Sequence, residues 1–150
     1  MNTHEWHLAL NHIPVIGSLW TFALLLAALF RSSRTLLITG WVSTGVVVLA
    51  VLAASRTGLA AEAIINREPG ISSQAITTHA ALAQQALLPA AGALAAVILS
   101  WILLRRGHSV RTATVLPIIA LGMMGWVVAQ TAHSGGKIHR PELRHSQPQD

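Results

Sequence analysis

Histidine is the residue type in this sequence of 150 residues that is best able to bind a metal or a cofactor. The sequence contains eight histidines and no cysteine. A neutral imidazole is cheaper to bury than a carboxylate or an ammonium group, and it keeps a ligand nitrogen for iron, copper or zinc. The lack of cysteine excludes disulfides, thiolate nucleophiles, iron–sulfur clusters and a covalently attached c-type haem. Any metal or haem must therefore be held by histidine, methionine, carboxylate or backbone groups.

Long stretches without charge surround these histidines. Hydrophobic residues make up 53% of the chain and charged residues only 10%, against about 25% charged residues in soluble domains. Charge is absent from residues 6–30, 35–55, 69–104 and 112–136. Each stretch is long enough for a spanning helix, which needs about 20 apolar residues. The composition therefore excludes a disordered chain and nearly every soluble enzyme, and it predicts a small polytopic membrane protein.

The predicted fold class is all-α, an integral membrane four-helix bundle with up-down-up-down topology. The bundle should occupy residues 1–135, followed by a polar C-terminal tail at 136–150. We expect its helices at about 13–30, 36–54, 73–104 and 113–132.

Several residues mark the expected ends and contacts of these helices. Pro14 fits the first turn of the first helix, and the run Ser134-Gly135-Gly136 predicts the end of the fourth. The third segment exceeds one bilayer thickness, so it should project from the hydrocarbon or kink at Pro89. Small residues should let the helices approach closely, and the candidates are Gly40, Gly45, Gly92, Gly122 and Gly125.

The basic residues indicate how the chain crosses the membrane. A formal charge of +5 could indicate a nucleic-acid partner, but the basic residues stand in small groups at the ends of apolar segments. That placement is typical of topology signals, so we predict a lipid bilayer and no nucleic acid as partner. The positive-inside rule places the short basic links in the cytoplasm and both termini in the periplasm of a bacterial inner membrane. The arginines of these links are Arg31, Arg34, Arg105, Arg106 and Arg111.

On this topology seven of the eight histidines lie on the outer side, and only His108 lies in a cytoplasmic link. His12, His79 and His133 come from three different helices, and they stand 19, 26 and 22 residues from the first arginine at the opposite end. At about 1.5 Å per helical residue, the three approach one level near the outer interface. The core of a helix bundle is a standard place for a cofactor site.

The favoured cofactor is haem b, which two histidine nitrogens on opposite sides of the iron would hold without a covalent link. We predict that His12, His79 and His133 supply these axial ligands. The alternative is copper or zinc bound by the same three histidines. His7 and His139 are reserve ligands if more than one haem binds. The basic side chains that could pair with haem propionates are Arg56, Lys137 and Arg140.

The chain resembles a family of small bacterial four-helix membrane proteins of unknown function. The resemblance rests on the entry Asn11-His12-Ile13-Pro14, on His79, and on the exit His133-Ser134-Gly135-Gly136-Lys137-Ile138-His139-Arg140-Pro141-Glu142. The family pattern has Arg-His where this chain has His139-Arg140. Related membrane proteins are often associated with cytochromes, so the resemblance implies a haem-binding or redox role like that of a cytochrome b.

We therefore predict a haem b-binding electron-transfer protein or subunit. No nucleophile–base pair, phosphate loop or carboxylate pair stands out, so no catalytic residue is assigned and electron transfer is favoured over independent catalysis. The expected partners are a quinol or a soluble cytochrome, within an oligomer or a larger membrane complex. The alternatives are a copper- or zinc-binding membrane protein and a purely structural subunit.

Overall fold

The computed structural model describes residues 3–65 and 73–139, and it describes side chains over 12–58 and 73–136. All regular structure in these ranges is helical, as the sequence predicts. The helices are α1 (Thr3–Arg31), α2 (Arg34–Ile65), α3 (Ser73–Gln85), α4 (Leu87–Arg105) and α5 (Val110–His139).

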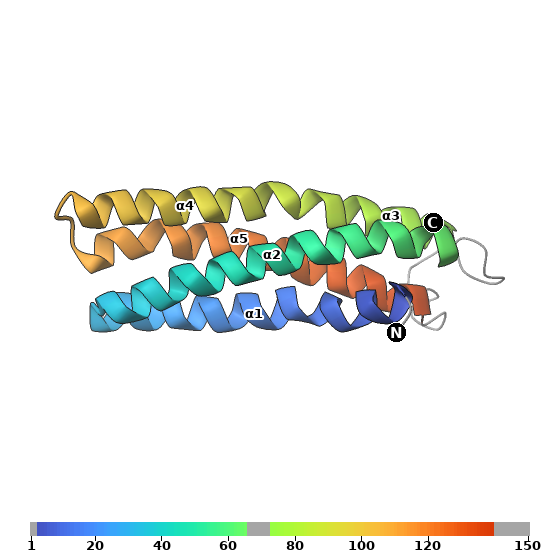
Figure 1. The fold of residues 1–150 in the computed structure, drawn as a ribbon, viewed down its shortest axis with the longest axis horizontal. Coiled ribbons are helices and arrows are strands. Elements are labelled where there is room, and N and C mark those ends of the chain that lie inside the picture. The colour runs from blue at the N-terminus through green and yellow to red at the C-terminus, as the bar shows by residue number, and fades with distance from the viewer. Residues whose placement is uncertain (1–2, 66–72, 140–150) are drawn as a thin grey trace, which may run out of the picture.

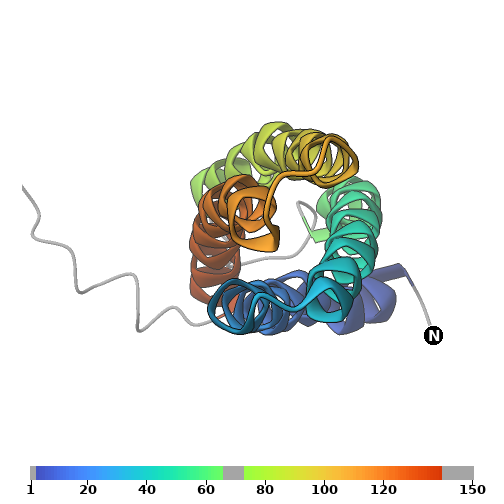
Figure 2. The ribbon, with the colours of Figure 1, turned by 90° about the vertical axis from the view of Figure 1, so that its left-hand side faces the viewer.

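The helices form a long bundle in which α3 and α4 together act as one rod (Figure 1). Consecutive rods run in opposite directions, and the end-on view shows four rods around a common axis (Figure 2). One end, called here the short-loop end, holds the turns at residues 32–33 and 106–109. The opposite end, called the long-loop end, holds the beginnings of α1 and α3 and the end of α5 (Figure 1).

Four helical stretches are long and apolar enough to cross a membrane, which supports a multi-pass membrane protein. They are His12–Arg31, Arg34–Gly58, Ser73–Arg105 and Val110–Gly136. Their outward faces carry large apolar side chains, including Leu88 with 81% of its surface exposed and Phe30 with 74%. Such a surface would aggregate in water but suits contact with lipid.

The predicted interruption of the third segment is present as a break at Ala86, between α3 and α4. Pro89 accounts for it, because proline has no N–H to donate and its ring crowds the carbonyl four residues earlier, that of Gln85. Helical hydrogen bonds continue on both sides, from Ala86 N to Leu82 O and from Ala90 N to Ala86 O. The break therefore interrupts the hydrogen-bond pattern of one spanning rod without dividing it.

Three helix ends lie beyond the predicted positions. α1 begins at Thr3, which places Pro14 inside the helix rather than in its first turn. α2 continues to Ile65, beyond the predicted end near 54. α5 continues through both glycines of the predicted stop to His139, beyond the predicted end near 132. All three extensions lengthen the bundle at the long-loop end, where polar and charged residues weaken the hydropathy signal for a helix.

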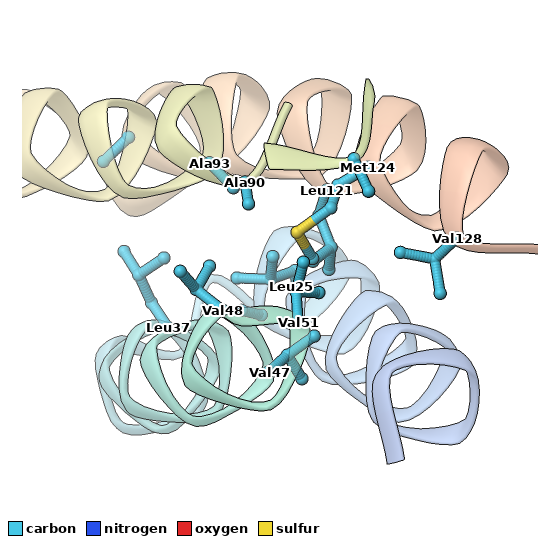
Figure 3. Packing of buried hydrophobic residues seen from close by; sticks show 13 residues of the cluster. Leu25, Leu37, Val47, Val48, Val51, Ala90, Ala93, Leu121, Met124 and Val128 are labelled. Carbon is cyan, nitrogen blue, oxygen red and sulfur yellow. The ribbon is translucent and has the colours of Figure 1, made fainter. Parts of the chain in front are cut away.

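The interior contains branched apolar side chains from α1, α2 and α5 with alanines from α4 (Figure 3). Two glycines of the α1–α2 pair permit close approach, because an added Cβ would lie 2.8 Å from Val47 Cγ2 at Gly17 and 2.5 Å from Leu25 Cδ2 at Gly40. At Gly45 and Gly92 an added Cβ would meet nothing within 4 Å. Of the predicted packing glycines, Gly40 therefore makes the tightest contact.

Candidate functional site

A pocket opens between the rods near the long-loop end, and we call it the His79 pocket. Its cavity volume is about 30 Å³, which is room for about one or two water molecules, so a larger ligand has to move its walls apart. Every rod of the bundle contributes to its walls. The lining residues are Pro14, Val51, Ala54, Ser55, His79, Ala83, Ala86, Val128 and Thr131.

His79 is the residue of this lining with the greatest ligand capacity. It lies on α3, is partly buried, and its Nδ1 is 3.0 Å from the carbonyl oxygen of Thr131 and 2.9 Å from Ser134 Oγ on α5. The Ser134 hydroxyl itself donates to the Thr131 carbonyl at 2.7 Å. A carbonyl only accepts hydrogen bonds, so the proton of this contact belongs to Nδ1. A neutral His79 therefore carries its lone pair on Nε2.

Gly135 lets the imidazole ring lie directly against α5. A Cβ added at this glycine would stand 3.0 Å from Cε1 of His79 and 3.3 Å from its Nδ1, closer than side chains ordinarily pack. At the adjacent Gly136 an added Cβ would meet nothing within 4 Å. The first glycine of the pair thus forms the seat of the ring, inside a helix that continues through it.

His12 and His133 lie at the same end of the bundle but on other faces of their helices. Both are exposed, and neither lines the His79 pocket. His133 follows Thr131 by two residues, which turns it about 200° around α5 from the wall of the pocket. Over the side chains that the structure describes, no group of three or more histidines, cysteines or carboxylates could hold a metal ion.

The remaining predicted site residues fall into two groups. Arg56 is exposed on α2, directly after Ser55 of the pocket wall. His7, Lys137 and His139 lie within α1 and α5, but their side chains are outside the described part of the structure, and Arg140 lies wholly outside it. His108, which was predicted to have no site role, is exposed in the turn at the short-loop end.

Three α5 residues around His79 had no site role in the sequence interpretation, which took Ser134 and Gly135 only as part of a helix end. Thr131, Ser134 and Gly135 are spaced i, i+3 and i+4, so they share one face of a helix. That spacing was available in the sequence, but it becomes visible only if α5 is taken to continue through the glycines. Two hydroxyl-bearing residues and a glycine on one face would then have indicated a place where a side chain from another helix packs and forms hydrogen bonds.

Comparison of the chain with known protein families, with curated proteins and with solved structures gives no match. The function must therefore be argued from the His79 pocket itself.

Proposed function

We propose that this protein is a membrane-embedded electron-transfer protein that binds haem b in the His79 pocket, with His79 as its protein ligand. The observation that carries the proposal is the hydrogen bond from Nδ1 of His79 to the Thr131 carbonyl. Ligand histidines almost always donate their second ring N–H to a carbonyl or carboxylate, which fixes the ring and makes the ligand nitrogen more basic. His79 has this arrangement, at the level where the sequence predicts a cofactor.

The walls of the pocket support the same proposal. Apart from three polar side chains the walls are apolar. Ala54, Ala83 and Ala86 contribute only small side chains to them. An apolar site with few polar groups is typical of cofactor pockets. Arg56 is the described basic residue nearest in sequence to the lining, and in this proposal it pairs with a propionate. The haem supplies one-electron chemistry, while the chain sets its position and surroundings.

The donor set fits one axial ligand and not two. His79 lines the pocket, whereas His12 and His133 are exposed on other faces. The proposal therefore departs from the bis-histidine arrangement expected from the sequence. The three-histidine copper or zinc site has less support, because the described residues do not gather the three side chains.

A second candidate is a quinol-binding site in the same pocket. The specific observation that favours it is the mostly apolar lining with Ser55, His79 and Thr131 as its polar groups. These three side chains offer hydrogen-bonding groups of the kind that a quinol hydroxyl can engage. A soluble cytochrome, a second copy or a larger membrane complex would then complete the electron path.

The deciding experiment is an absorption spectrum of the protein purified after expression with a haem supply. We expect a Soret band, its loss in His79→Ala, and its recovery when imidazole is added to that variant, because free imidazole replaces the missing ligand. His108→Ala, at the other end of the bundle, should keep the wild-type spectrum. Circular dichroism checks that all variants remain helical.

The other outcomes separate the alternatives. A colourless protein with stoichiometric copper or zinc would overturn the haem proposal in favour of metal binding. A colourless protein that co-purifies with a quinone, and loses it in His79→Ala, would establish the second candidate. A His133→Ala or His12→Ala variant that loses haem as completely as His79→Ala would contradict the single-ligand site.

A further inference from the structure

Five arginines stand in or beside the two turns of the short-loop end, at the opposite end of the bundle from the His79 pocket. Arg31 and Arg34 flank the α1–α2 turn, Arg105 and Arg106 end α4, and Arg111 begins α5; all five are exposed. The sequence has no aspartate or glutamate between Glu5 and Glu62, or between Glu68 and Glu142. No carboxylate of either turn therefore offsets this positive charge.

The two turns that carry the arginines are joined across the bundle. Nε of Arg111 donates to Ser32 Oγ at 2.9 Å, and Ser32 holds a left-handed backbone with φ of 49°. The guanidinium has five N–H donors, and this contact uses one of them. The bond brings the α1–α2 turn and the start of α5 together as one basic surface.

Helix ends add no net potential to this surface. α2 and α5 begin here but α1 and α4 end here, so the partial positive and negative charges of the helix termini offset one another. The side chains of Ser33 and Ser109 cap the starting helices, accepting from Leu36 N at 3.3 Å and Thr112 N at 3.2 Å. The positive potential of this surface therefore comes from the arginines.

Apolar side chains lie on the bundle surface immediately beside the arginines. Trp101 is 49% exposed, with the guanidinium carbon of Arg105 5.2 Å from its ring centroid, and Phe30 beside Arg31 is 74% exposed. Aromatic rings at this level are typical of the membrane interface. A ligand that matches both parts of the surface has a phosphate and acyl chains.

We propose that the short-loop end is a binding surface for anionic phospholipid, with phosphatidylglycerol as the defining class. The headgroup phosphate meets Arg34, Arg106 and Arg111, and the acyl chains follow the surface of α4 beside Trp101. Basic surfaces of this kind hold anionic headgroups at the membrane face. The proposal is independent of any cofactor in the His79 pocket.

The test is native mass spectrometry of the full chain in micelles that contain equal amounts of phosphatidylglycerol and phosphatidylcholine with the same acyl chains. The wild type should retain the anionic lipid at least about fivefold more than the zwitterionic one, as expected for the contribution of a single arginine or more. The variant Arg34→Gln/Arg106→Gln should lower that ratio by at least about fivefold. Neither side chain takes part in the bond between the two turns, so the fold should persist.

The matched control is Arg67→Gln/Arg144→Gln, which removes the same charge outside the short-loop turns and should keep the wild-type ratio. An equal loss of the ratio in this control would show an effect of net charge alone and overturn the proposal. So would a wild type that retains both lipids equally. If the double variant loses its helical circular dichroism, the single variants Arg34→Gln and Arg106→Gln carry the same comparison.

Discussion

The ring of His79 is held by three α5 residues that do different physical work. The Thr131 carbonyl and the Ser134 hydroxyl accept from Nδ1 and thereby determine the tautomer. Gly135 provides the space that the ring occupies. If His79 is the haem ligand proposed above, it loses little rotamer freedom on binding, because its ring is already held in place.

Gly135→Val should weaken cofactor binding, because its side chain would displace the imidazole ring from α5. Loss of such a supporting contact typically costs about 10–100-fold in affinity. Haem titration of the purified apoprotein, followed at the Soret band, measures the effect. Gly136→Val is the control, since a Cβ there meets nothing within 4 Å. Equal affinities for the two variants would contradict the role given to Gly135.

At this scale the sequence predicted His79 but not its surroundings. A histidine near the start of an apolar segment is visible from composition and spacing, whereas the Ser134-Gly135-Gly136 run has the usual signature of a helix end. The helix continues because tertiary packing outweighs local propensity, which for glycine is unfavourable by only about 1 kcal/mol. The side chains that His79 contacts could not be deduced without that helix.

Glycines allow α1 and α2 to pack closely, because a glycine on each helix leaves room for a side chain of the other. Leu25, fully buried on α1, lies against Gly40 of α2, and Val47 of α2 lies against Gly17 of α1. In lipid, where the hydrophobic effect does not drive helices together, such close packing is a main source of association. The contact also aligns the two helices that contribute Pro14 and Val51 to the pocket.

Gly40→Ala should destabilise the bundle by about 1–3 kcal/mol relative to Gly45→Ala, because overpacking a filled interior forces side chains or backbone to move. Both substitutions are on α2 and gain the same helix propensity, but an added Cβ meets Leu25 at the first position and nothing within 4 Å at the second. Unfolding in mixed detergent micelles compares the two. Equal stabilities of the two variants would contradict the prediction, because they would show that the Leu25 side chain moves aside at no cost in free energy.

The elements themselves were largely predictable, and their ends were not. Four apolar stretches of spanning length identify four rods, because the bilayer imposes a minimum length on each. The start of α1 at Thr3 and the end of α5 at His139 lie in polar sequence, where hydropathy has no signal. The interruption near Pro89 was one of two predicted alternatives, because proline removes a helical hydrogen bond. Its position was not specific to that residue, since α1 and α5 continue through Pro14 and Pro117.

For the whole molecule, the distribution of charge predicts the short-loop end in the cytoplasm and both termini in the periplasm. The chain has no native cysteine, so single cysteines report sidedness directly. His108→Cys and Ser73→Cys replace exposed residues at opposite ends of the bundle. In intact cells a membrane-impermeant maleimide should label the Ser73 position and reach the His108 position only after permeabilisation. The reverse pattern would invert the topology.

Most buried hydroxyls of the bundle donate within their own helix, and this has a consequence for biogenesis. Ser18 donates to Pro14 O, Thr44 to Gly40 O and Thr114 to Val110 O, each four residues back. Each helix can therefore enter the bilayer with these polar groups already satisfied, before it meets a neighbour. The bonds that join helices, such as Trp41 to Ser100, can form afterwards. Insertion and assembly thus become separable steps, and a defect in a joining bond should leave inserted helices that fail to associate.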